Sequence, residues 1–149
     1  MVLPDLSVST PAATALVEIT DEVRAAVRGA GIRSALVVAY VPHTTAAITI
    51  QENADPDVKA DLLLALENAV PARPARGAYQ HAEGNSDAHT KAALVGTSAT
   101  LVVRGGELLL GTWQGIFLCE FDGPRQRTVH LEAIVGVEHP LPPRAGSGG

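Results

Sequence analysis

The stretch SATLVVRGGELLLGTWQGIFLCEFDGPRQRTVHLEAIVG, residues 98–136, decides the fold class of this 149-residue chain. It is rich in apolar and β-branched residues, and turn-forming residues interrupt it at Gly105-Gly106 and at Asp122-Gly123-Pro124. Glycine and proline at such intervals favour tight turns between strands. We therefore predict an antiparallel meander of four strands, over residues 99–104, 107–112, 115–121 and 126–135.

The segment before this meander predicts both strands and helices. Residues 6–18 indicate two short strands that meet at a bend near Pro11 and form a sheet edge. Thr20 is a suitable N-cap for a helix that ends near Gly29, because its hydroxyl can accept a backbone N–H bond. Compact β-rich runs over residues 34–41 and 46–50 then predict two further strands.

Two more helices are expected in the middle of the chain. Asp55-Pro56 is a strong helix start, and the helix should run to about Ala69. Its predicted buried stripe consists of five apolar residues, Val58, Leu62, Ala65, Leu66 and Ala69. Asn85 or Ser86 is expected to cap a shorter helix over residues 87–95, with Gly96 as its terminator.

Length and composition indicate one domain over residues 1–136, followed by a Pro-, Gly- and Ser-rich tail over 137–149 that we expect to be flexible. No apolar run approaches the roughly 20 residues of a membrane span, and no secretory signal is evident. These features predict a cytoplasmic protein that binds no membrane. A net charge of −5 and 3% aromatic residues argue against nucleic-acid binding. The single cysteine, Cys119, is interpreted as a small core residue.

Three of the five histidines stand in two polar segments, around His43 and from His81 to His89. Neutral imidazoles bind divalent ions such as zinc, and three of them leave a fourth position open for water or substrate. The spacing alone is a weak signal, so these histidines could also be solvent-facing or satisfied within the core. We interpret His130 and His139 as solvent-facing or core-satisfied histidines rather than metal ligands.

Further polar residues could serve the same site. Arg125 and Arg127 stand two apart around a turn, so in an extended strand they share a face and could hold a phosphate or carboxylate. Glu52 follows the second β-rich run and could orient an imidazole or deprotonate a metal-bound water. Polar groups that could complete an anion pocket are Thr44, Thr45, Asn85 and Gln114. Trp113 is more often a core or interface anchor than a substrate stack.

Four blocks together carry a family resemblance: PHTTAA at 42–47 with ENAD at 52–55, then His81, Gly84-Asn85 and His89, then LGTWQG at 110–115, then FDGPR at 121–125. In this order they resemble the YjbQ family, often labelled secondary thiamine-phosphate synthase, over about residues 6–136. The resemblance implies a compact α+β domain with antiparallel β-layers and helices, assembled as a homotrimer with sites near the subunit interfaces. It also implies that His43, His81 and His89 bind a divalent metal, with zinc expected, and that Arg125 and Arg127 suit an anionic ligand.

The family label implies an enzyme that joins a pyrimidine diphosphate to a thiazole phosphate, giving thiamin phosphate and pyrophosphate. A divalent metal and two arginines could neutralise the charge of the diphosphate leaving group. The same residues would equally suit a metal-dependent hydrolase of a small anionic metabolite. A non-catalytic trimeric protein that binds such a metabolite is the third hypothesis, and the sequence does not choose among them.

Overall fold

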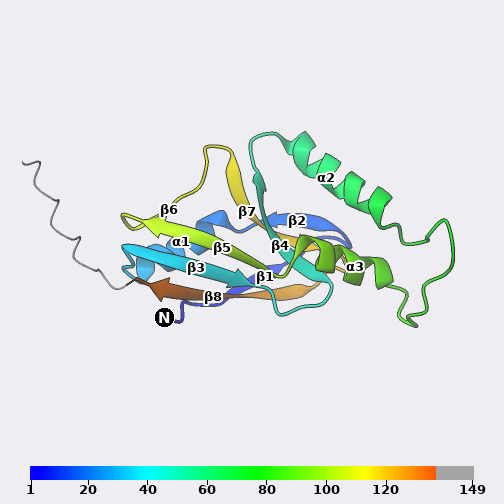
Figure 1. Cartoon of the computed structure of the whole chain (residues 1–149), viewed down its shortest axis with the longest axis horizontal. Helices are drawn as coiled ribbons and strands as arrows, with labels where there is room; N and C mark the ends of the chain where they lie inside the picture. Colours follow the sequence, from blue (N-terminus) through cyan, green and yellow to red (C-terminus); the bar gives the residue numbers. More distant parts are fainter. Residues whose placement is uncertain (137–149) are drawn as a thin grey trace, which may run out of the picture.

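The computed structural model describes residues 1–136, and the tail predicted over 137–149 lies outside these described residues. Three helices and eight strands follow one another along the chain, in two separate antiparallel sheets (Figure 1). The strands are β1 (Leu6–Ser9), β2 (Ala15–Glu18), β3 (Ser34–Tyr40), β4 (Ala46–Glu52), β5 (Ser98–Arg104), β6 (Glu107–Leu108), β7 (Gln114–Glu120) and β8 (Gln126–Val135). The helices are α1 (Thr20–Gly29), α2 (Pro56–Ala69) and α3 (Ser86–Val95).

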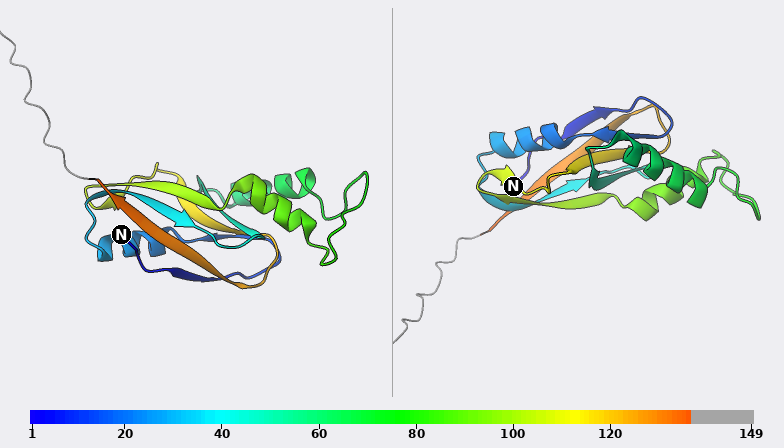
Figure 2. Two further views of the ribbon diagram at one scale, coloured as in Figure 1. Left: turned by 60° about the horizontal axis from the view of Figure 1, so that its bottom comes forward. Right: turned by 90° about the horizontal axis from the view of Figure 1, so that it is seen from above.

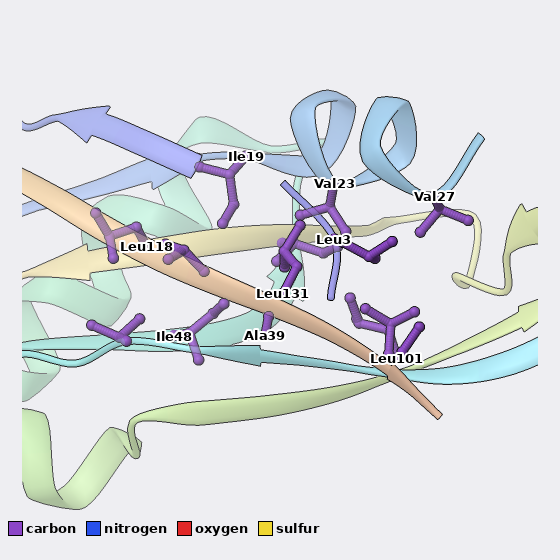
Figure 3. Packing of buried hydrophobic residues seen from close by; sticks show 14 of the residues in the cluster. Leu3, Ile19, Val23, Val27, Ala39, Ile48, Leu101, Leu118 and Leu131 are labelled. Atoms are coloured by element: carbon purple, nitrogen blue, oxygen red, sulfur yellow. The ribbon is translucent and has the colours of Figure 1, made fainter. Parts of the chain in front are cut away.

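A five-stranded sheet in the order β1-β8-β3-β5-β6 packs against a three-stranded sheet in the order β2-β7-β4. The main core lies between them and contains alternate residues of facing strands, among them Val37, Ile48, Leu101 and Leu131. Helix α1 adds Val23 and Val27 to the same core (Figure 3). The α+β class predicted for the chain is therefore confirmed, with both sheets fully antiparallel.

The outer face of the three-stranded sheet carries a second, smaller core beneath α3. Ala47 and Cys119 from the sheet meet Ala88 and Ala92 from the helix there. Strand β4 thus sends Ala46 and Ile48 into one core and Ala47 into the other, as the two-residue period of a strand requires. Cys119 is 1% exposed, and burial raises the pKa of its thiol to about 12, which confirms that it is a core residue.

The predicted meander over residues 98–136 is wrong in its pairing. Strand β5 does form a hairpin with β6, but β6 ends at Leu108 rather than Thr112. Strand β7 then joins the other sheet between β2 and β4, and β8 returns to lie between β1 and β3. The run Ile116–Cys119 is buried on both faces, so β7 needs the central position of a sheet that is covered on both sides.

Two helix predictions also require correction. Thr20 is the first residue of α1 rather than its N-cap, and its hydroxyl accepts a bond of 2.9 Å from the backbone N–H of Ile116. Asn85 is the N-cap of α3, but its side chain makes no capping bond. By contrast, Asp55 caps α2 as predicted, accepting a bond of 2.9 Å from the backbone N–H of Asp57.

Helix α2 lies to one side of the sheets and packs little against them (Figures 1 and 2). None of its side chains is buried, so the predicted buried stripe is wrong for the isolated chain. Val58, Leu62 and Leu66 are only half-buried, and Leu64 is 59% exposed. Within residues 1–136, no helix is long and apolar enough to cross a bilayer.

Candidate functional site

The loop between β3 and β4 places His43 beside strand β8. Its Nε2 accepts a hydrogen bond of 2.9 Å from the backbone N–H of Thr128, which assigns the proton of a neutral ring to Nδ1. Burial lowers the pKa of His43, and the positive charge of Arg127 lowers it further. The imidazole is therefore neutral near pH 7 and offers Nδ1–H as a donor.

Arg127 is a buried arginine at the start of β8, only 5% exposed. Its Nε donates to Glu120 Oε2 over 2.8 Å, and its Nη2 donates to Glu120 Oε1 and to the hydroxyl of Thr45. Glu120 itself is fully buried at the end of β7. A two-point pair of this kind fixes the plane of the guanidinium as well as its position.

Arg125 lies on the turn between β7 and β8 and is held differently. Its Nε donates to the carbonyl oxygen of Asp122 over 2.7 Å, and its Nη2 donates to the carboxylate of the same residue over 2.9 Å. That carboxylate also accepts from the side-chain amide of Asn85 at the start of α3. Asn85 thereby connects the α3 end of the site to the turn that carries Arg125.

These groups surround one open hollow of about 290 Å³. Three of the four histidine and arginine side chains that we expected to act together with His43 line it, because His89, Arg125 and Arg127 all contribute. The other lining residues are Pro42, Thr44, Thr45, Glu83, Asn85 and Asp122. The structure thus brings together His43, both arginines, both threonines and Asn85 from three separate segments of the sequence.

His81 and His89 form a pair beside this hollow. Their rings meet edge to face with centroids 5.4 Å apart, and both line an adjoining hollow of about 410 Å³ with Ser86 and Thr90. Two imidazoles that bind one tetrahedral zinc ion at about 2 Å have ring centroids roughly 5 Å apart. The centroid spacing of this pair is therefore compatible with two ligands of a single ion.

The third predicted ligand, His43, is not grouped with this pair around one point. Among residues 1–136, no three His, Cys, Asp or Glu side chains are grouped so that one ion could bind to all of them. His43 lines a hollow together with His89, but its Nε2 lone pair is used by the N–H of Thr128. His43 would have to exchange that hydrogen bond for an ion before it could complete a three-histidine set.

Glu52 and Gln114 lie at a different end of the molecule from His43. They are cross-strand partners at the far end of β4, whereas Thr45 directly precedes its first residue. A seven-residue strand is about 20 Å long, so one chain does not bring Glu52 to the histidines. Oε2 of Glu52 is buried without a hydrogen-bond partner in the described part of the chain.

Trp113 is next to Gln114 and is 64% exposed, so it is not a core anchor in this chain, and its alternative role as an interface anchor stays a prediction. Gln114 is used locally, since its Oε1 accepts from the backbone N–H of Gly111 over 2.8 Å. His130, assigned to no site, forms an exposed pair with Asp5 at 2.9 Å. His139 falls outside the described residues.

Sequence reasoning missed Glu120 and Thr10, which support Arg127 and Arg125. The signal for Glu120 is its position, since a carboxylate that directly follows the apolar run Ile116–Cys119 has to be buried with a partner. No comparable signal marks Thr10. Its hydroxyl meets Glu120 only because folding brings the residue that follows β1 to the end of β7.

The comparisons with known proteins agree with this architecture. A UPF0047 protein from Methanocaldococcus jannaschii is 49% identical over 119 residues, covering 80% of this chain and 84% of that protein. The UPF0047 protein YugU of Bacillus subtilis is 46% identical over 132 residues, covering 89% and 98%.

Solved structures of related proteins also superpose on this chain. An uncharacterised conserved protein of the YjbQ/UPF0047 family from Clostridium acetobutylicum superposes with a TM-score of 0.83 at 46% identity, covering 88% of this chain and 99% of that one. A hypothetical protein from Aeropyrum pernix gives a TM-score of 0.84 at 32% identity, covering 91% and 100%. The model of the family described as "UPF0047 protein YjbQ-like" matches residues 4–136. The chain therefore belongs to the YjbQ/UPF0047 family.

Proposed function

We propose that this protein is an enzyme that acts on a small phosphorylated metabolite in the hollow around His43, Arg125 and Arg127. The observation that carries the proposal is the convergence of two arginines and the His43 imidazole on one concave surface, beside the His81–His89 pair. Guanidinium groups match phosphate oxygens in geometry and charge. The hydroxyls of Thr44 and Thr45 supply further polar groups at the same wall.

The specific reaction that we propose is thiamin phosphate formation, as the YjbQ resemblance implies. The C–O bond between the pyrimidine methylene and its diphosphate breaks, a C–N bond to the thiazole nitrogen forms, and pyrophosphate leaves with the bonding electron pair. Arg125 and Arg127 would stabilise the charge that develops on the leaving oxygens. His43 would add a hydrogen bond from Nδ1–H, since its lowered pKa keeps the ring neutral.

The chemistry of the donor set fits a divalent metal ion, most favourably zinc. His81 and His89 would hold it with His43 as third ligand, and the ion would supply additional neutralisation of the diphosphate charge. The spacing of the His81–His89 rings supports this assignment. The assignment requires His43 to release the N–H of Thr128, because one lone pair cannot serve both partners.

We further propose that the protein is a homotrimer and that a neighbouring copy supplies Glu52 and Gln114 to each site. Three observations support this arrangement. Helix α2 leaves apolar side chains such as Leu64 uncovered, and Trp113 is exposed next to Glu52. Glu52 as a whole is half-buried, and its Oε2 has no hydrogen-bond partner among residues 1–136, so a change of rotamer would present this oxygen to a donor such as an imidazole N–H from another copy.

The test of the reaction is an assay with both proposed substrates and with each one alone. Thiamin phosphate and pyrophosphate should appear in equal amounts only when the pyrimidine diphosphate and the thiazole phosphate are both present. Arg125→Met and Arg127→Met should each lower turnover, while Arg33→Met, an arginine outside the hollow, should not. Release of phosphate from the diphosphate alone would instead indicate a hydrolase and contradict the transferase assignment.

A further inference from the structure

Glu120 is the most heavily bonded side chain near the hollow, although it does not line the hollow itself. It is fully buried, and its two carboxylate oxygens accept hydrogen bonds from five donor atoms. Oε1 accepts from Arg127 Nη2 and from the backbone N–H groups of Phe121 and Asp122. Oε2 accepts from Arg127 Nε and from the hydroxyl of Thr10.

These bonds reach both arginines of the proposed anion site. Arg127 is contacted directly, and its remaining guanidinium nitrogen, Nη1, is the one for which the described residues supply no hydrogen-bond partner. Arg125 is reached through Thr10, whose hydroxyl oxygen accepts from the backbone N–H of Arg125 over 2.8 Å. Glu120 therefore contacts the guanidinium of Arg127 directly and supports the backbone of Arg125 through Thr10.

The turn between Glu120 and Arg125 packs directly against the side chain of Glu120. A Cβ atom at Gly123 would lie 2.3 Å from the carbonyl oxygen of Ala12, 2.8 Å from Cγ of Glu120 and 2.9 Å from the hydroxyl of Thr10. No side chain fits there, so the turn has little room to shift relative to Glu120. The position of Asp122, which holds the guanidinium of Arg125, follows from the same packing.

We propose that Glu120 is a positioning residue for anion binding, which fixes the plane of the Arg127 guanidinium and the turn that carries Arg125 so that both arginines act on one phosphate group. This inference rests on the proposed function, because it assumes that the hollow binds an anion. Glu120 does not touch the anion. It acts by preventing Arg127 from adopting other rotamers, which reduces the ordering cost when a ligand binds.

The isosteric variant Glu120→Gln tests this role. Glutamine keeps the volume of the side chain but replaces one acceptor oxygen with an NH2 donor, which would face donors of Arg127, Thr10 or the backbone. Inorganic phosphate is titrated calorimetrically into wild type, Glu120→Gln, Arg127→Met and the double variant. Phosphate affinity should fall about tenfold in Glu120→Gln, the equivalent of one charge-assisted hydrogen bond.

The double variant separates positioning from a general structural role. If Glu120 acts by positioning the arginines, adding Glu120→Gln to Arg127→Met should lower phosphate affinity by clearly less than the loss in the wild-type background, because only the effect through the Arg125 turn remains. Leu101→Ala is the matched control, because it opens a cavity in the main core away from the hollow. It should lower the melting temperature and leave phosphate affinity within about twofold of wild type.

The outcomes are distinguishable. Wild-type protein that binds no phosphate would overturn the proposed anion site and this inference with it. Phosphate affinity that falls in Arg127→Met but not in Glu120→Gln would overturn the positioning role alone and leave the proposed function standing. If Glu120→Gln does not fold, Thr10→Val takes its place with an expected loss of about threefold, and wild-type affinity in that variant would equally overturn the inference.

Discussion

The backbone N–H of Thr128 donates a hydrogen bond of 2.9 Å to Nε2 of His43, and this bond uses the lone pair that a metal ion would need. Imidazole that is neutral has one such lone pair. In this arrangement Nε2 of His43 has no lone pair left for an ion, whereas after exchange of the bond it would be a ligand. The two states differ in whether Nε2 of His43 accepts from the backbone of Thr128 or binds an ion together with His81 and His89.

Metal analysis decides between these states. We expect wild-type protein to bind about one zinc ion per chain, as a single tetrahedral site requires. His89→Ala and His43→Ala should both lose it, because each removes one of three nitrogen ligands. His130→Ala is the control, since that histidine pairs with Asp5 on the surface and should not affect metal content. Wild-type protein that takes up no added zinc would contradict the metal assignment.

Acid should destabilise the protein through Glu120. Burial opposes ionisation of this carboxyl group, but the bonds from Arg127, from the backbone N–H of Asp122 and from Thr10 outweigh it and hold the pKa below the ordinary 4.5. A group whose pKa is lowered by folding stabilises the protein above its unfolded pKa, and this contribution is lost as pH falls through the folded value. The free energy of unfolding should therefore decrease below about pH 4.5.

The matched comparison is between wild type and the double variant Glu120→Gln/Arg127→Met, in which both members of the buried ion pair are uncharged. This double variant should lose less stability between pH 5 and pH 3 than wild type, as measured by urea unfolding. Arg127→Met alone should cost about 3 kcal/mol near pH 7, because it leaves a buried carboxylate unpaired. Equal acid sensitivity of wild type and double variant would show that other carboxyl groups dominate the response.

Mixing two inactive variants tests whether neighbouring copies share a site. If Glu52 of one chain serves His89 of another, then refolding Glu52→Ala together with His89→Ala should produce some sites with both residues intact. Turnover should reappear in the mixture, although each variant alone is inactive. Sedimentation should give three chains per particle in every sample. A mixture that remains inactive while mixed trimers form would contradict the sharing of Glu52 and His89 between copies.

A pair of glycines tests the turn on which Arg125 depends. Gly123→Ala should lower the free energy of unfolding by about 2–3 kcal/mol, because its Cβ would meet backbone and buried side-chain atoms. Gly29→Ala, at the last position of α1, meets nothing within 4 Å and should raise it by about 0.5 kcal/mol. Chemical denaturation measures both changes. A neutral Gly123→Ala would mean that the turn can move away from Glu120.

Local signals in the sequence predicted most elements. Asp55-Pro56 and Gly96 marked helix ends correctly because capping depends on a few adjacent residues. The pairing of β7 and β8 was not predicted, since Gly111–Gly115 resembles a hairpin connection whether or not the chain changes sheets. The apolar stripe predicted on α2 is not buried in the described chain, because periodicity marks an apolar face but does not show whether the same chain covers it.

The site was also predicted only in part, because local sequence signals identify the chemistry of a side chain but not its place in the fold. His43, Arg125 and Arg127 do share a hollow, and each was chosen for its chemistry. Glu52 was placed near His43 because the two are only nine positions apart in sequence. Strand β4 extends those residues to opposite ends of a sheet, so short sequence distance became long spatial distance.

His89 lines both the hollow it shares with His81 and the hollow that contains the arginines. An ion bound through the first and an anion bound in the second would therefore share one imidazole. If the bound ion changes the affinity for the anion by some factor, the bound anion changes the affinity for the ion by the same factor, because thermodynamic linkage is reciprocal. Metal uptake by this protein should consequently report on its substrate, even before any product is identified.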